Sequence, residues 1–273
     1  MVDKGKIVII STVVNKDLYN ISAKCHPKGI KRIVIDGSTG MYGINSLFFM
    51  FNKLNNTNYD WVIMADEDVF FTCPNEIFEI VDFMDENNYA ICGVRDGGEI
   101  NHRNFNPHVV NTFFSVLNLK KIKKYLNKSE ILKNQYPIKS NEKAFSILKY
   151  AYDIDSLYEA YYCLYFYLIR KGLKFLYLKA VSPYLDSITN AVLTPSSKTL
   201  LIHTWHARDF NKSEKHTQRI YNIIKNIEIN DNQEIDYEVW RDNLFLVKKK
   251  IDMIKKKIKR VFNQFSIILL SIL

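Results

Sequence analysis

The sequence predicts an α/β fold in which a mostly parallel sheet has helices on both of its faces. Two observations lead to this prediction. Short runs of β-branched residues alternate along the chain with segments in which apolar residues recur every three or four positions. The runs are apolar throughout, rather than at every second position, as is typical of strands that helices cover on both sides.

Strands and helices alternate most regularly in the first half of the chain. The apolar runs there predict four strands, over residues 7–14, 32–36, 59–65 and 89–94. Helical spacing predicts two helices between them, over residues 43–54 and from Pro74 to Met84. Further along, we expect surface helices or an insertion over residues 118–141. A helix over residues 156–171 and two strands over residues 174–178 and 199–204 follow.

Acidic residues stand at the ends of two predicted strands. Asp36 ends the second strand, and the triplet Asp66-Glu67-Asp68 follows the third. In sheets of this kind, ligands bind outside the carboxyl ends of the strands. We therefore expect the functional site at this edge, with Thr12 at the end of the first strand beside it.

The triplet contains two aspartates separated by one residue, which is weak evidence by itself. With 17 aspartates in 273 residues, chance predicts about one such pair, and a second occurs at Asp153-Ile-Asp155. Only Asp66 and Asp68 follow an apolar strand, where neighbouring carboxylates repel each other unless a cation offsets their charge. Mg²⁺ and Mn²⁺ take such oxygen ligands together with phosphates. We interpret Asp66 and Asp68 as metal ligands, and a solvated acidic turn is the alternative.

Two histidines follow the last predicted strand closely. A histidine is able to complete a metal shell of oxygen and nitrogen, and strand alternation places His203 and His206 on different faces. We therefore expect one ligand and favour His203, with a core or capping role as the alternative. Arg208 follows, and its planar guanidinium suits a diphosphate, although a surface arginine has the same pattern.

These segments together resemble the GT-A-type glycosyltransferases, enzymes of Rossmann-like fold that use nucleotide-diphospho-sugar donors. Residues 34–39 (Val-Ile-Asp-Gly-Ser-Thr) resemble the second-strand segment whose aspartate contacts the nucleobase in many of these enzymes. Residues 64–68 resemble their metal-binding DxD motif, and residues 202–208 resemble the late segment whose histidine completes the metal site. The resemblance covers about residues 6–210, and members that build bacterial surface polysaccharides are the most similar type.

The resemblance implies a metal-dependent site with Mn²⁺ or Mg²⁺. Asp68 would contact the metal directly, Asp66 would contact the donor ribose or reach the metal through water, and His203 would be the third ligand. The residues implied to contact the donor nucleotide are Thr12, Asp36, Asp66 and Arg208. Gly37 departs from the commoner double-aspartate form, which leaves the nucleobase contact open.

The catalytic base is harder to place than the metal site. Residues 153–159 match the helix start from which inverting members take this base, and we expect Asp155, or else Glu159, to accept the proton of the acceptor hydroxyl. However, Ser156 and Glu159 also fit a capping box, and Asp155 fits an N-cap. Residues 93–98 and 111–115 are candidates for the wall of the same cleft, although for the two phenylalanines of the latter we favour core packing.

The basic charge of the chain lies in its last part. Of a net charge of +9, residues 241–260 carry +7, so a nucleic-acid cleft across the body is not indicated. Apolar residues from Leu244 to Ile272 recur in steps of three and four, flanked by lysines. A coiled-coil homodimer would place these lysines against each other, whereas an anionic membrane attracts them. We expect residues 1–230 to form a transferase domain and residues 231–273 a basic amphipathic tail.

The predicted function is a metal-dependent glycosyltransferase, of hexosyltransferase type, that acts on a glycan or lipid-linked acceptor. The chain begins with a predicted strand rather than a signal peptide, and its four cysteines are scattered. We therefore expect reduced thiols and a cytoplasmic enzyme, peripheral on the inner face of the membrane. One alternative is a sugar-phosphate nucleotidyltransferase, which would need the glycine-rich loop that residues 12–16 lack. Another is an inert glycan-binding or membrane adaptor.

Overall fold

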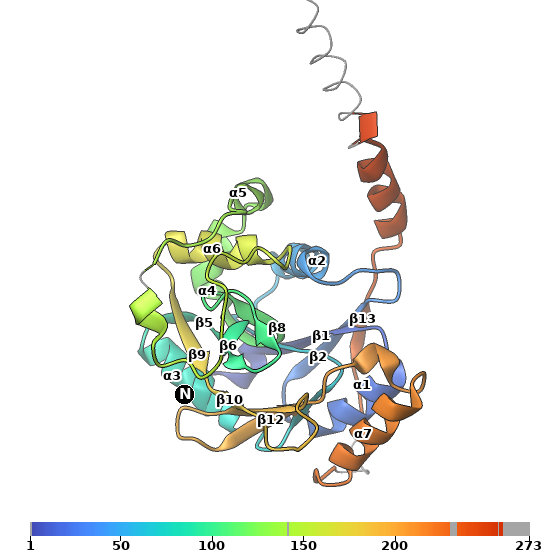
Figure 1. Cartoon of the computed structure of the whole chain (residues 1–273). Helices are drawn as coiled ribbons and strands as arrows, with labels where there is room; N and C mark the ends of the chain where they lie inside the picture. The colour runs from blue at the N-terminus through green and yellow to red at the C-terminus, as the bar shows by residue number, and fades with distance from the viewer. Residues whose placement is uncertain (1, 141, 230–233, 256, 259–273) are drawn as a thin grey trace, which may run out of the picture.

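The main sheet of the protein has seven strands in the order β13-β2-β1-β3-β8-β5-β9 (Figure 1). The computed structural model describes all residues except 1, 141, 230–233, 256 and 259–273. The strands are β1 Ile7–Val13, β2 Lys31–Asp36, β3 Trp61–Ala65, β5 Tyr89–Arg95, β8 Val110–Asn118, β9 Lys174–Leu178 and β13 Glu238–Trp240. Every neighbouring pair is parallel except the two that involve β8, which runs antiparallel to β3 and β5.

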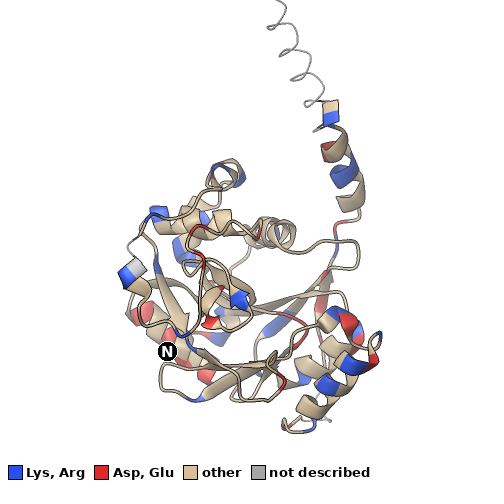
Figure 2. Ribbon diagram, in the orientation of Figure 1, with Lys and Arg blue, Asp and Glu red and all other residues tan. Residues whose placement is uncertain are grey.

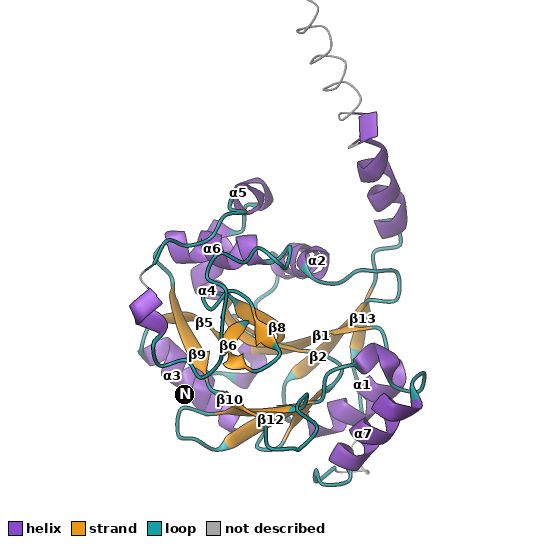
Figure 3. Ribbon diagram, viewed as in Figure 1, coloured by secondary structure: helices purple, strands orange, loops and turns teal. Residues whose placement is uncertain are grey.

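Residues of the central strands alternate between two hydrophobic cores. In β1, Ile7 and Ile9 face one core, and Val8 and Ile10 face the other. Helices supply apolar side chains to both cores (Figure 3): α3 Glu76–Glu86 and α7 Glu214–Ile224 to the first, α2 Ile44–Leu54 and α6 Tyr162–Arg170 to the second. The structure confirms the predicted α/β class, a mostly parallel sheet with helices on both faces.

A second, antiparallel sheet packs into the first core. Its strands, in spatial order, are β10 Ala180–Val181, β11 Asn190–Leu193, β12 Thr199–His203 and β4 Val69–Phe71. In the β4–β12 pair, Val69 lies opposite His203. This pairing brings the segment that follows β3 next to the late histidine segment. Shorter elements are α1 Lys16–Ser22, β6 Gly97–Ile100, β7 Arg103–Asn104, α4 Leu119–Ile122 and α5 Lys128–Lys133.

The helix expected over residues 156–171 begins only at Tyr162. Before it, Asp153 accepts two hydrogen bonds, from Ser156 N–H to its carbonyl at 3.2 Å and from Asp155 N–H to its carboxylate at 3.0 Å. These local bonds satisfy the backbone in turns and compete with helix formation. The capping box that was the structural alternative for Ser156 and Glu159 is not formed, because α6 begins after both residues.

Strand β13 comes from the segment that was expected to belong to the tail. It pairs with β2, and Trp240 and Phe245 are buried in the second core. From residue 245 a helix leaves the body of the molecule, and Figure 2 shows its lysines. The predicted continuation of the apolar stripe to Ile272 lies outside the described residues. Within the described part of the chain, no helix is long and apolar enough to cross a bilayer.

Buried His26 makes the stability of the fold sensitive to acid. The side chain is 1% exposed, and among the described residues neither ring nitrogen has a hydrogen-bond partner. The ring contacts the edges of Tyr19 and Phe71, with ring centroids 5.9 and 5.7 Å away. Burial, and secondarily the nearby Arg32, lowers the pKa of His26 from 6.5 to about 3.

We predict that His26 destabilises the protein below neutral pH. Because its pKa is depressed in the folded state, stability is retained above pH 6.5 and lost as the pH falls from 6.5 toward 3. The loss between pH 7 and pH 5 should be about 2 kcal/mol. Urea unfolding at both pH values measures it, and His26→Phe should remove this part of the slope. An unchanged slope in that variant would contradict the assignment.

Candidate functional site

A cavity of ≈ 510 Å³ lies at the carboxyl ends of β1 and β3. Its walls come from the end of β1, the start of α2, the acidic triplet, the start of β8 and the segment after β12. The structure thus brings together side chains that the sequence had placed at or after separate strand ends, and one from a predicted helix start: Thr12, Asp66, Asp68, His203 and Arg208, with Glu159. Asp36 and Asp155 do not line this cavity.

Asp66 and Asp68, the first and third residues of the triplet, both line the cavity but are buried to different degrees. Asp66 is half-buried, and burial, Asp68 and Glu67 together hold its pKa well above the usual range. Asp68 is 3% exposed, and its Oδ1 lies 3.2 Å from Nε2 of His203, which is also 3% exposed. A buried carboxylate and imidazole therefore meet on the cavity wall, beside a second carboxylate.

Glu67, the middle residue of the triplet, has a structural role. Its carboxylate accepts hydrogen bonds from the backbone N–H groups of Val14 and of Asn15, the latter at 2.9 Å. Asn15 in turn donates from its side-chain amide to the carbonyls of Ala207 and Phe210, at 3.0 and 2.9 Å. One buried carboxylate and one amide thus connect the loops that follow β1, β3 and β12. Burial raises the pKa of Glu67 to about 7.

The position of His203 is set by strand pairing and by aromatic neighbours. It is the last residue of β12, and its ring stacks on Phe113 at 4.1 Å and contacts Trp205 at 4.2 Å between centroids. Nδ1 is buried and has no partner among the described residues. His206 instead lies at the rim of the cavity. Two consecutive residues, Trp205 (φ 58°) and His206 (φ 63°), have left-handed backbone conformations here.

The donor set of Asp66, Asp68 and His203 fits a divalent cation. Carboxylate oxygens are the ligands that Mn²⁺ and Mg²⁺ prefer, and one imidazole would complete the set. A cation would also offset the repulsion from Asp68 and Glu67 that, after burial, raises the pKa of Asp66. The three are not equally close: among the described residues, no group of three that includes them has its ligand atoms all within 4.8 Å of one another. Since Asp68 and His203 are already close, Asp66 is the more distant member.

The candidate donor-binding residues occupy different places. Thr12 and Arg208 line the cavity, and the guanidinium of Arg208 lies 4.3 Å from the ring centroid of Tyr42, another wall residue. Asp36 accepts hydrogen bonds from Ser38 Oγ at 2.6 Å and from Arg241 Nε at 2.9 Å. These partners hold the pKa of Asp36 below its usual range. A nucleobase contact by Asp36 would require Arg241 to release it.

The two candidate bases are separated by the structure. Glu159 lines the cavity, and its Oε1 lies 3.6 Å from Nη2 of Arg103. Asp155 is exposed in the turn before α6 and does not line the cavity, so the first choice made from the sequence is not supported by its position. The reason is the late start of α6, which leaves Asp155 in a turn instead of a helical cap.

Arg103 is a wall residue that the sequence did not indicate. Its guanidinium donates two hydrogen bonds to the buried carboxylate of Asp96, at 2.8 and 2.9 Å. Asp96 also accepts from Asn111 at 2.6 Å and from the hydroxyl of Tyr162. Residues 111–113 line the cavity, Phe113 and Phe114 both pack in the first core, and none of residues 93–98 lines the cavity. The one local signal for this network was Asp96 itself, a charged residue at the end of an apolar strand.

No family model matches the chain, and no curated protein matches it either. Solved structures do match it. An active-site mutant of LgtC is 11% identical with a TM-score of 0.41, over 83% of this chain and 98% of the other. Mouse xyloside xylosyltransferase 1 is 10% identical with a TM-score of 0.38, over 64% and 84%. A cytidylyltransferase from Leptospira borgpetersenii is 15% identical with a TM-score of 0.36, over 85% and 100%.

Several of the matched structures are glycosyltransferases, which is the class of enzyme that the sequence resembles. The cytidylyltransferase represents the competing class. The choice between the classes depends on the chemistry of the site.

We predict that Glu67 holds the site together rather than binding the metal. Glu67→Ala leaves two backbone N–H groups without their acceptor, which should lower the free energy of unfolding by about 1–3 kcal/mol. Glu67→Gln keeps an oxygen acceptor at the same place and is the matched control, with a much smaller loss. Thermal and urea unfolding measure both. Equal stability of Glu67→Ala and the wild-type protein would exclude this role.

Proposed function

We propose that the protein is a metal-dependent glycosyltransferase that moves a sugar from a nucleotide-diphosphate donor to an acceptor hydroxyl. One observation carries the proposal: the buried Asp68 and His203 meet at 3.2 Å in a cavity that Asp66 also lines. This cavity lies at the carboxyl edge of a mostly parallel sheet, where such folds bind their ligands. A nucleotidyltransferase is disfavoured because the loop after β1 has no glycine-rich phosphate cradle, and Glu67 occupies its N–H groups.

The metal would be held by Asp68 and His203. Asp66 would contact the metal directly or through water, or would contact the donor ribose. When bound, Mn²⁺ or Mg²⁺ supplies a Lewis acid that neutralises the diphosphate leaving group. Arg208 has an exposed guanidinium on the same cavity wall and adds a second positive charge there. We assign Thr12, near the end of β1 and on the cavity wall, to donor binding.

The acceptor hydroxyl needs a group that takes its proton in an inverting reaction. We assign this role to Glu159, because it is the cavity-lining member of the two candidates. In the transfer, the acceptor oxygen bonds to the anomeric carbon while the bond from that carbon to the diphosphate breaks, and Glu159 takes the hydroxyl proton. The guanidinium of Arg103, 3.6 Å from the Glu159 carboxylate, orients it.

The basic helix that follows β13 favours an acceptor at a membrane. Val247, Ile251 and Ile254 are 53, 45 and 58% exposed, at spacings of four and three residues, and lysines flank them. We propose that this helix, with the rest of residues 241–273, binds the anionic inner face of the cell membrane. The acceptor would then be a lipid-linked glycan of polysaccharide synthesis. Each lysine near such a surface contributes about 1 kcal/mol.

Removal of the Asp68 carboxylate tests the metal assignment. Asp68→Asn should abolish Mn²⁺-dependent binding of UDP- or GDP-sugars in calorimetry, while unfolding stays cooperative. Asp153→Asn, in the second aspartate pair outside the cavity, is the matched control and should bind like the wild-type protein. Donor binding that needs no metal, or metal-dependent binding of nucleoside triphosphates alone, would overturn the transferase proposal.

The two candidate bases are separated by a pair of isosteric variants. Glu159→Gln should lower kcat by about 10²-fold or more, because a general base contributes roughly that much. Asp155→Asn should leave kcat within about twofold, because its side chain does not reach the cavity. Sugar transfer to acceptor, followed with saturating donor, measures both. The reverse order of effects would move the base to Asp155.

The membrane proposal is tested by flotation of the full chain with vesicles. Binding should require anionic lipid, weaken with added salt, and fall strongly when Lys248, Lys249 and Lys250 are changed to glutamine. Neutral phosphatidylcholine vesicles are the control. Flotation that is equal for both lipids, or unaffected by the lysine changes, would contradict it.

A further inference from the structure

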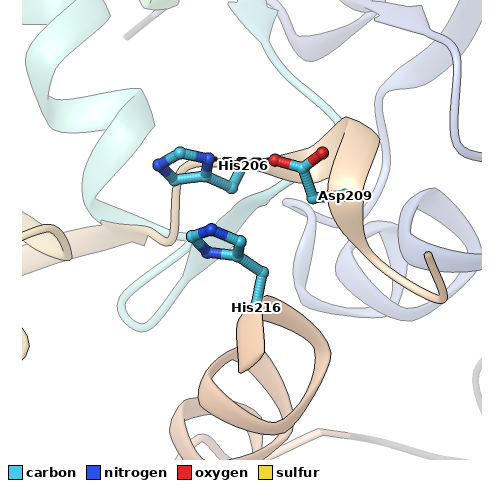
Figure 4. Close-up of side chains that lie close together, drawn as sticks. All are labelled: His206, Asp209 and His216. Carbon is cyan, nitrogen blue, oxygen red and sulfur yellow. Dashed lines mark hydrogen bonds and ion pairs between the residues drawn. The ribbon is translucent and has the colours of Figure 1, made fainter. Parts of the chain in front are cut away.

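A second cluster of metal-binding side chains lies at the rim of the cavity. His206 and Asp209 lie on either side of a short turn, and His216 lies in the first turn of α7 (Figure 4). One nitrogen or oxygen of each lies within 4.8 Å of the others, and within the described ranges this is the one group of three with that property. We propose that these residues bind a transition-metal cation of the Zn²⁺ class, distinct from the cation at Asp68.

The donor atoms determine which cation this site prefers. Two imidazole nitrogens and one carboxylate oxygen suit Zn²⁺, Co²⁺, Ni²⁺ or Cu²⁺, whereas Mg²⁺ and Mn²⁺ prefer oxygen. Three protein ligands also leave a fourth position open for water or for a ligand from the cavity. The site of Asp66, Asp68 and His203 has the opposite balance, with two carboxylates and one imidazole, so the two sites select different metals.

The distances show that one pair is already placed for ligation. His206 Nδ1 lies 3.0 Å from Asp209 Oδ2. In a tetrahedral site with metal–ligand bonds of about 2.0–2.1 Å, ligand atoms are about 3.3 Å apart. The His216 ring stacks on His206 at 4.0 Å between centroids, so it has to turn its nitrogen toward the point that His206 faces. Its ligand atom, within 4.8 Å of the other two, then approaches by up to about 1.5 Å. A change of side-chain rotamer is enough for this movement.

An unsatisfied nitrogen supports the same site. His216 Nδ1 is buried and has no hydrogen-bond partner among the described residues, although the rest of this side chain is partly exposed. Buried polar atoms normally have a partner. A cation bound at the ring edges, where the nitrogen lone pairs point, and next to the Asp209 carboxylate supplies one.

The cation has a structural consequence for the cavity. In the sequence, His206 and Asp209 flank Arg208, whose guanidinium lies over Tyr42 on the cavity wall. The backbone here is strained, with positive φ at both Trp205 and His206. A cation bound by residues on both sides of Arg208 in the sequence fixes this turn and therefore the direction of the guanidinium. The part of this inference that concerns donor binding rests on the proposed function, and the cation site itself does not.

The test uses the full chain, stripped of metal with EDTA and carrying Asp68→Asn to remove the inner site. Calorimetry with Zn²⁺, and visible absorption with Co²⁺, should show one tight site per chain. Adding His216→Gln or Asp209→Asn should weaken it by at least about 10-fold, because each removes one of three ligands. His108→Gln is the matched control, since His108 contacts Ser140 at 2.8 Å, away from this rim.

A second measurement keeps the test independent of the Asp68 change. In the wild-type protein, Zn²⁺ should slow backbone hydrogen exchange over residues 205–216, and Mg²⁺ should not. Zn²⁺ affinity that is equal in the His216→Gln, Asp209→Asn and His108→Gln variants would overturn the site. If Zn²⁺ binding persists as expected but no nucleotide sugar binds, the proposed function fails while this site stands.

Discussion

The carboxylate of Glu67 is the constraint on which the site depends. It is buried, it lies between the two aspartates of the triplet, and it accepts the N–H groups of Val14 and Asn15. Consecutive side chains leave the backbone in different directions, so the inward direction of Glu67 decides where Asp66 and Asp68 point. A buried carboxylate without such donors would be costly, so the loop after β1 and the triplet stabilise each other.

The β4–β12 pair is the second constraint. Antiparallel pairing places His203 opposite Val69, the residue after Asp68, so an imidazole from late in the chain reaches a carboxylate from its first quarter. Phe113 and Trp205 then hold the ring from two sides. After β12 the backbone turns through two positive φ angles, and this turn separates His206 from the inner site and places it at the rim. The two histidines of one short segment thus have two different environments.

The edge of the main sheet anchors the start of the basic helix. β13 pairs with β2, and the next residue, Arg241, binds the carboxylate of Asp36 at the end of β2. The helix that begins at residue 245 therefore starts from a fixed point of the main sheet, a short distance along the chain from that ion pair. A surface that bound this helix would therefore also keep the sheet edge that carries Asp36 close to it.

Local patterns in the sequence determined the fold class and most of its elements, because burial on a sheet or helix face imposes a short repeat that any window of the chain displays. They also placed Asp66, Asp68 and Asp36 at strand ends. The tertiary structure decided what depends on contacts between distant segments. Strand register put His203, and not His206, against Asp68. A local turn kept Asp155 out of the cavity and left Glu159 in it, and the buried Asp96 positioned Arg103, which no sequence pattern marks. Neither the turn at Asp155 nor the long-range contacts give a periodic signal, because the turn depends on local hydrogen bonds and the contacts depend on which strand lies beside which.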